Sequence, residues 1–182
     1  MSLTLTKNIF NKYKNNYNIF IETGTYKGGS VELALECEFN KIYTIDISNQ
    51  HKLECQLKFE EQIKNKQVEL LFGDTIDVLP SILEKVNEPC LFWLDSHFDM
   101  HSDTRGKYDC PILQELEIIK SSKIKNHTIM IDDLRIFKNQ TIWGVGIYIE
   151  DIEKKLIEIN SSYKFYYENG WDINDILIAK YE

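Results

Sequence analysis

Acidic side chains stand at or beside the ends of five short apolar runs in this sequence. These acids are Glu22, Asp46, Asp74, Asp95, Asp132 and Asp133. A carboxylate can accept hydrogen bonds from ligand hydroxyls, take up a proton or hold a hard cation. If the runs are parallel strands, their carboxyl ends meet at one edge of a sheet, where open α/β proteins bind ligands. The pattern therefore predicts one site lined by these carboxylates.

A glycine-containing loop follows the first run, with the sequence E-T-G-T-Y-K-G-G-S over residues 22–30. Glycine lets the backbone approach a ligand closely. The loop lacks the complete G-x-G-x-x-G of a dinucleotide-binding fingerprint and the G-K-[ST] of a phosphate loop. Asp46 follows Gly24 by 22 residues, a spacing that brings a carboxylate to the two hydroxyls of a ribose. The alternative is a helix cap with an unrelated surface acid.

Asp95, His97, Asp132 and Asp133 form a second candidate cluster. Neighbouring parallel strands lie about 4.8 Å apart, so the ends of the fourth and fifth runs can converge. Carboxylates that share one place repel each other unless a cation or a proton neutralises them, so Asp95, Asp132 and Asp133 are candidate ligands of Mg²⁺. The alternative has no metal: Asp132 caps a turn, Asp133 pairs with Arg135, and Asp95 or His97 acts as a general base.

Aromatic and polar residues near these acids add further expectations. Trp93 lies inside the fourth run and is expected in the core, whereas Trp143 and Trp171 fall in loops and could stack on a sugar. The polar segment 98–108 is either a lid over the site or a solvated loop. His51 and His127 lie away from the ends of the runs and are expected to be ordinary surface or packing residues.

The elements that must position these groups follow from the apolar patterning. Strands are predicted at residues 18–23, 41–47, 68–74, 90–95 and 128–133. Helices are predicted at residues 29–37, 49–64, 75–86, 111–121 and 151–160, with an N-terminal helix near 5–13. Two final strands, 163–167 and 175–179, flank an Asn169-Gly170 turn. We expect a Rossmann-like, doubly wound α/β fold whose mostly parallel, seven-stranded sheet ends in an antiparallel C-terminal strand pair.

Three details of the helices are also predicted. Leu53, Leu57 and Ile63 should form the apolar face of the helix at 49–64. Pro80 should kink the helix at 75–86 or make it restart, because proline has no N–H to donate. Pro111 is well placed at the first position of its helix.

Composition limits the class of protein. The chain has 182 residues and a formal net charge of −8, with 43% hydrophobic residues. We expect one domain over 1–182, with 1–16 as an N-terminal helical extension. The acidic balance argues against a nucleic-acid partner, and no apolar stretch is long enough for a membrane span. The N-terminus does not resemble a secretory signal, and four widely spaced cysteines indicate reduced thiols, so a cytoplasmic location is expected, in the host cytoplasm if the source is viral.

The ordered strand ends resemble those of class I S-adenosylmethionine-dependent methyltransferases. The resemblance rests on E-T-G-T-Y-K-G-G-S, on T-I-D at the second strand and on F-G-D-T at the third. A small branch of O-methyltransferases is most similar, through F-W-L-D-S-H, D-x-P-I-L-x-E-L at 109–116 and I-D-D-x-R-x-F at 131–137. The resemblance covers roughly residues 8–180 and does not specify a substrate.

The resemblance implies a role for each matched residue. Glu22, Gly24, Thr25 and Gly28 would line the methionine and ribose part of S-adenosylmethionine, and Asp46 would bind the ribose hydroxyls. Asp74 with Thr75 would hold the adenine amino group, and Asp95 would lie where donor and acceptor meet. Asp95, Asp132 and Asp133 resemble the site of metal-dependent enzymes that methylate catechols and macrolide sugars, in which Mg²⁺ activates the acceptor hydroxyl.

The expected function is methyl transfer from S-adenosylmethionine to a hydroxyl of a sugar or polyol, within a glycan or its precursor, with Asp95 and His97 as catalytic residues. A small-molecule or glycan substrate is therefore the expected partner, without nucleic acid or membrane, and a homodimer is left open. The alternatives are an NAD-dependent oxidoreductase and an inactive Rossmann-like binding module.

Overall fold

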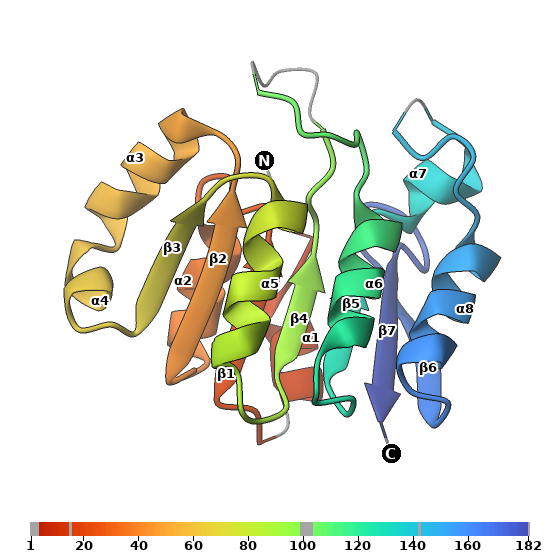
Figure 1. Cartoon of the computed structure of the whole chain (residues 1–182), viewed down its shortest axis with the longest axis horizontal. Coiled ribbons are helices and arrows are strands. Elements are labelled where there is room, and N and C mark those ends of the chain that lie inside the picture. The colour runs from red at the N-terminus through yellow and green to blue at the C-terminus, as the bar shows by residue number, and fades with distance from the viewer. Residues whose placement is uncertain (1–3, 15, 99–103, 142, 182) are drawn as a thin grey trace.

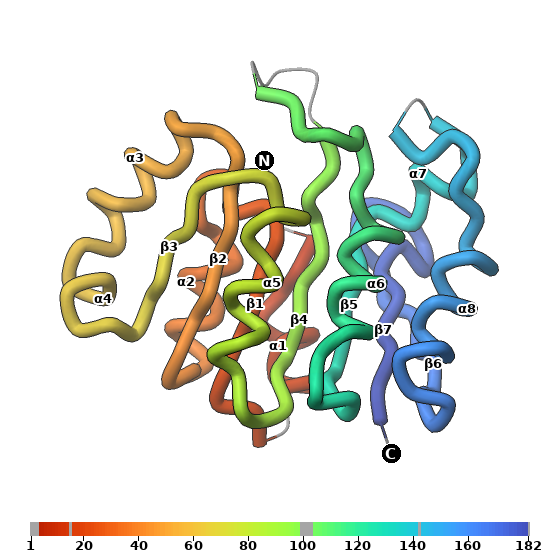
Figure 2. Tube along the Cα trace, in the orientation of Figure 1, coloured from red at the N-terminus to blue at the C-terminus, as the bar shows by residue number. Residues whose placement is uncertain are grey.

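A seven-stranded sheet organises the computed structural model, which describes residues 4–14, 16–98, 104–141 and 143–181. The strands are β1 (Ile19–Thr23), β2 (Lys41–Asp46), β3 (Val68–Phe72), β4 (Leu91–Leu94), β5 (Thr128–Ile131), β6 (Tyr163–Glu168) and β7 (Ile176–Tyr181). Their order across the sheet is β3-β2-β1-β4-β5-β7-β6. The first five strands are parallel, and β7 pairs antiparallel with both β5 and β6 (Figures 1 and 2). This confirms the predicted fold class.

Helices cover both faces of the sheet (Figure 1). They are α1 (Lys7–Lys14), α2 (Gly29–Glu36), α3 (Asn49–Lys58), α4 (Glu60–Lys64), α5 (Thr75–Lys85), α6 (Ile112–Ser121), α7 (Leu134–Lys138) and α8 (Ile149–Ile159). Side chains of α5, α6, α7 and α8 pack in one apolar core with alternate residues of the strands. Those of α1, α2 and α3 form the core on the opposite face. Because both faces are covered, β1, β4 and β5 are buried along their whole length, as their apolar sequences predict.

The predicted helix at 49–64 is wrong in two respects. The helix divides at Phe59, whose backbone (φ −112°, ψ 28°) leaves the helical region. The ring of Phe59 occupies the space that a side chain on Gly28 would need. Leu53 and Leu57 are 53% and 81% exposed, so they do not form the buried face. Cys55 and Phe59 are buried instead and pack in the same core as Val31 and Ala34 of α2, a tertiary contact that the spacing of the leucines does not predict.

Two prolines bear on the predicted helices. Helix α5 continues through Pro80 without a restart, because Leu79, Ile82 and Leu83 are buried and hold the helix on the sheet. Pro111 was predicted at the first helical position, but it is the N-cap of α6, one residue before the helix begins at Ile112. The short helix α7 was not predicted.

Register sets the contacts at the carboxyl edge of the sheet. Pairing of Thr23 with Leu94 places Gly24 against Asp95, and a Cβ on Gly24 would lie 2.4 Å from the Asp95 carbonyl oxygen. Gly24 also has φ +89°, a backbone region that favours glycine. Pairing of Leu94 with Ile131 brings Asp95 beside Asp132 in the same way. The sheet therefore gathers the predicted acids at one edge.

The described residues include no helix that is both long enough and apolar enough to cross a membrane. Cys37, Cys55, Cys90 and Cys110 are free and buried, as the wide spacing of the cysteines predicts. Residues 99–103 of the predicted lid lie outside the described residues.

Candidate functional site

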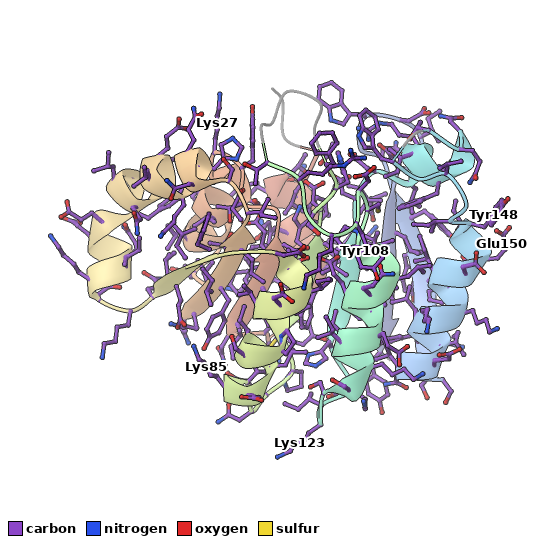
Figure 3. The ribbon with its side chains drawn as sticks, turned by 45° about the horizontal axis from the view of Figure 1, so that its top comes forward. Lys27, Lys85, Tyr108, Lys123, Tyr148 and Glu150 are labelled. Carbon is purple, nitrogen blue, oxygen red and sulfur yellow. The ribbon has the colours of Figure 1, made fainter. Side chains whose placement is uncertain are left out.

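A cavity of about 730 Å³ opens at the carboxyl ends of the parallel strands. Its volume lies in the range typical of small-ligand sites. Figure 3 turns this edge toward the viewer, with Lys27 and Tyr108, which both line the cavity, well apart from Lys85 and Lys123 at the other end of the molecule. We call the part around Gly24, Thr25, Tyr26 and Asp46 the glycine-loop side, and the part around Asp95, His97, Asp132 and Asp133 the acidic side.

Most of the predicted site residues line this cavity. They are Gly24, Thr25, Asp46, Asp74, Thr75, Asp95, His97, Asp132 and Asp133. Glu22 and Gly28 do not belong to the lining and lie behind it. Gly28 has φ +73° and is the N-cap of α2, and its missing side chain makes room for the ring of Phe59.

Glu22 lies behind the glycine loop and is connected to it by hydrogen bonds. Its carboxylate is fully buried and accepts hydrogen bonds from the hydroxyls of Ser30 and Thr44, the latter at 2.6 Å. Thr44 Oγ1 is also 2.5 Å from Thr25 Oγ1, so the network reaches the cavity wall. Burial raises the pKa of Glu22 to about 7, although the two hydroxyl donors oppose the shift.

Asp46 is held by backbone donors on the glycine-loop side. Its carboxylate accepts N–H groups of Tyr26 and Ser48, each at 2.7 Å, and His51 Nδ1 lies 3.5 Å away. Burial raises the pKa of Asp46, while these donors stabilise its charged form. The contact corrects the expectation for His51, which lines the cavity; His127 is a packing residue, as predicted, and its Nδ1 accepts the N–H of Cys90.

Asp74 joins the third strand to the segment that follows β4. Its Oδ1 accepts the N–H of Ile76 and caps α5, and its Oδ2 accepts the N–H of Lys107 at 2.8 Å. Lys107 Nζ also reaches Asp77 at 2.6 Å, so the described part of the predicted lid rests on the start of α5. Sequence reasoning missed Glu115, a buried acid that accepts the Ser96 hydroxyl at 2.6 Å.

The acidic side is a network of charged side chains. His97 Nε2 lies 2.7 Å from Asp133 Oδ2 and 3.7 Å from Asp95 Oδ1. Burial lowers the pKa of His97, but the hydrogen bond to Asp133 and the charge of Asp95 outweigh it and raise this pKa to about 9. Burial and the neighbouring Asp132 raise the pKa of Asp95 well above its ordinary value. His97 is therefore a cation at neutral pH, and Asp95 takes up a proton more readily than an ordinary carboxylate.

Asp132 meets the N-terminal segment. The hydroxyl of Thr4 donates to Asp132 Oδ2, whereas Oδ1 is buried and has no partner among the described residues. Burial and the charge of Asp133 raise the pKa of Asp132 to about 7. Below about pH 7, a proton therefore neutralises the Asp132 carboxyl group in most of the molecules. Thr4 was not predicted, since nothing in the sequence marks it as close to Asp132.

The predicted metal set is not brought together as one group. Among the described residues, ligand atoms within 4.8 Å of one another form two groups, Asp95 with His97 and Asp133, and Asp132 with Asp133 and Asp175. Asp133, common to both, has Arg135 on Oδ1 and His97 on Oδ2. The unpartnered Oδ1 of Asp132 could face a cation, but the occupied oxygens of Asp133 do not fit a Mg²⁺ ligand, so we derive no step through a metal.

Two tryptophans from distant loops also line the cavity. Trp143 lies 5.9 Å from the His97 ring, measured between centroids, and Trp171 is 57% exposed at the turn before β7. Trp93 is buried, as predicted for the core. Asp175 was expected only as part of a strand; its contacts with Arg135 and α7 depend on the return of β7 beside β5.

Comparison with known proteins identifies the fold. No protein-family model and no curated protein sequence matches this chain. An O-methyltransferase from Bacillus cereus in complex with S-adenosylhomocysteine (SAH) is similar in structure, with a TM-score of 0.61 and 17% identity over 91% of this chain and 74% of that one. An SAH-bound methyltransferase from Podospora anserina has a TM-score of 0.61 and 13% identity, covering 95% and 75%.

A third similar structure is the O-methyltransferase TomG from Streptomyces achromogenes in complex with S-adenosylmethionine. Its TM-score is 0.61 at 13% identity, with 90% of this chain and 73% of that chain covered. Each of the three structures covers 90% or more of this chain. The protein described here has the Rossmann-like fold of class I S-adenosylmethionine-dependent methyltransferases.

Proposed function

We propose that this protein is an S-adenosylmethionine-dependent O-methyltransferase. The observation that carries the proposal is Asp46, a buried carboxylate at the end of β2 that faces a 730 Å³ cavity beside the glycine turn at Gly24. A carboxylate at this place in a doubly wound sheet accepts hydrogen bonds from the two hydroxyls of a ribose. The similarity in fold to proteins crystallised with S-adenosylmethionine or SAH supports the same ligand class.

The glycine-loop side would hold the cofactor by its backbone and its carboxylates. Gly24 and Thr25 turn sharply, their N–H groups donating to the Ile45 carbonyl, and leave space in front of β1. Glu22 fixes this turn through Thr44 and Ser30. Asp74 retains lone pairs on both carboxylate oxygens for the amino group of an adenine. S-adenosylmethionine supplies an electrophilic methyl group on a sulfonium.

The acidic side would bind and activate the acceptor. In the transfer, the bond between sulfur and methyl carbon breaks as an acceptor oxygen forms its bond to that carbon, and the hydroxyl proton must leave. Asp95 would take this proton, since its raised pKa makes it a better base than an ordinary carboxylate. His97 would donate a hydrogen bond to Asp133, and its charge, close to Asp95 as well, would reduce the repulsion between these two carboxylates. The chain's other contribution is the alignment of donor and acceptor.

A sugar or polyol hydroxyl, within a glycan or its precursor, is the acceptor class that we favour. Carboxylates and a histidine offer hydrogen-bond partners for several hydroxyls, and Trp143 and Trp171 offer aromatic faces for a sugar ring. The net charge of −8 disfavours a nucleic-acid substrate. Buried free thiols suit a reducing compartment such as the cytoplasm.

Calorimetry tests the cofactor first. We expect saturable binding of S-adenosylmethionine and SAH, and none of NAD, with and without Mg²⁺. Transfer of a labelled methyl group to a panel of sugars, nucleotide sugars and glycans would then identify the acceptor. Binding of NAD alone would overturn the proposal in favour of an oxidoreductase. Binding of SAH without transfer to any hydroxyl compound would favour a module that binds the cofactor without turnover.

A further inference from the structure

Asp133 decides whether the acidic side can hold a divalent cation, because it belongs to both groups of close ligand atoms. Each of its carboxylate oxygens has a cationic partner from this chain. Arg135 Nη1 donates to Oδ1, and His97 Nε2 lies 2.7 Å from Oδ2. The Asp133 side chain is only 8% exposed. A metal ion ligated by Asp133 would have to displace one of these partners and then lie beside its positive charge.

Arg135 is fixed in place by a second, fully buried carboxylate. Asp175 Oδ2 accepts Arg135 Nη1 at 2.5 Å, and Asp175 Oδ1 accepts the Arg135 N–H at 2.8 Å. The Asp175 carbonyl oxygen also accepts the N–H of Leu134 at 2.8 Å. Both the backbone N–H and the guanidinium of Arg135 therefore donate to Asp175. If the guanidinium moved away from this place, the Asp175 carboxylate would stay buried without its cationic partner.

Asp175 also explains why Asp133 is available for these contacts. Asp133 is the N-cap of α7 but has φ +61°, and its carboxylate points to Arg135 and His97 instead of the first turn of its own helix. Asp175, which directly precedes β7, supplies the missing acceptors for the N–H groups of Leu134 and Arg135. The antiparallel register that pairs Ile131 with Leu177 brings it there. The left-handed backbone at Asp133, which Asp tolerates, is thus supported from outside α7.

We propose that Arg135, anchored by Asp175, and His97 together take the position of a divalent cation on Asp133, so that the acceptor side of this protein works without a metal. The proposal depends on the proposed function only in treating the acidic side as the acceptor site. These two side chains of the chain itself occupy both carboxylate oxygens of Asp133. An acceptor hydroxyl would then meet His97 and Asp95 directly.

Manganese binding tests this without any knowledge of the acceptor. Mn²⁺ is added to the full chain at neutral pH, and the free ion is measured by electron paramagnetic resonance. Two variants release Asp133 independently. The first is Arg135→Gln with Asp175→Asn, which removes a partly buried cation and its fully buried anion together and so leaves the net charge unchanged. The second is His97→Gln. Each is paired with a control that also carries Asp133→Asn, and circular dichroism and SAH calorimetry establish that each protein is folded.

The wild-type protein should show no Mn²⁺ binding that depends on Asp133. Both variants should gain a site at least about tenfold tighter than any in the wild type, and Asp133→Asn should abolish the gain. Tight binding by the wild type that Asp133→Asn removes would overturn the proposal. So would the absence of a gain in both variants, because Arg135 and His97 would then not be what closes Asp133 to a metal. SAH binding reports separately on the proposed function: its loss in the wild type would refute the cofactor assignment and leave the manganese result intact.

Discussion

The two sides of the cavity are built in different ways. On the glycine-loop side, Asp46 is held by the N–H groups of Tyr26 and Ser48, and each contact spans 20 residues or fewer of the chain. On the acidic side, Asp133 is held by side chains, and the network reaches from Thr4 through His97 to Asp175. The first arrangement is local and relies on backbone donors. The second assembles charged groups from three separate segments of the chain and adds the hydroxyl of Thr4 from a fourth.

This difference has consequences for what a substitution does. Backbone donors cannot be removed by changing a side chain, so substitutions on the glycine-loop side should alter ligand affinity more than architecture. Charged side chains on the acidic side balance one another, and removal of one leaves another buried without a partner. Four substitutions test this contrast.

Asp175→Ala should have the largest effect. It leaves Arg135 with one carboxylate fewer and α7 without its acceptors, and we expect a loss of about 3 kcal/mol in the free energy of unfolding. Urea denaturation measures this loss. Asp175→Asn keeps an acceptor for the Arg135 N–H and should lose less. SAH affinity of the folded fraction should stay within about threefold, since the sites are separate. An unchanged urea midpoint would show that the network does not support the fold.

Asp46→Ala should mainly affect the cofactor. Loss of a charged acceptor for two ribose hydroxyls should weaken SAH binding by about a hundredfold, or about 2.7 kcal/mol. Calorimetry measures the affinity. Glu54→Ala is the matched control, because Glu54 is an exposed acid on the neighbouring helix α3. Equal affinities for the two variants would mean that the cofactor lies elsewhere in the cavity.

His97→Gln should change how stability depends on pH. The pKa of His97 is raised from 6.5 to about 9 in the folded protein, so its ion pairs stabilise the fold fully below pH 6.5 and this stabilisation is lost as the pH rises through 9. The difference between wild type and variant should therefore shrink by on the order of 2 kcal/mol across that range. Unfolding curves at several pH values measure it.

His127→Gln is the control for that series. Burial lowers the pKa of His127 to about 4, so this residue is neutral in the folded protein, and above about pH 7.5 it is neutral in the unfolded protein too and adds little slope there. A constant difference between wild type and His97→Gln across the range would contradict the assignment of His97 as a cation of the acidic side.

Trp171→Ala should have the smallest effect on the protein itself. Its side chain is mostly exposed, so the free energy of unfolding should change by less than about 0.5 kcal/mol and SAH affinity should not change. If the ring stacks on the acceptor, KM for the acceptor identified by the methyl-transfer screen should rise about three- to tenfold. Steady-state kinetics measure this, and an unchanged KM would remove Trp171 from the acceptor wall.

Sequence patterning predicted the seven strands to within a few residues, because buried parallel strands are continuous apolar runs. It also placed Asp46, Asp74, Asp95 and the pair Asp132–Asp133 at one edge, since parallel strands share a direction. It failed for α3, where Leu53 and Leu57 suggested a buried face that the packing of Phe59 assigns to other residues. It also missed α7, a short helix whose first N–H groups are capped by Asp175, the residue before β7.

The sequence by itself determined the fold class, the edge at which the site lies and the carboxylates of the glycine-loop side, because each depends on local propensity or on the direction of a strand. Only the tertiary structure decided the acidic side. The partners of Asp133 come from the segment after β4 and from the start of α7, and Asp175, which anchors Arg135, directly precedes β7. The partners of Asp132 include Thr4. Charged residues that lie far apart in the chain become partners only when β7 pairs with β5, and the register of this pairing selects which of them meet.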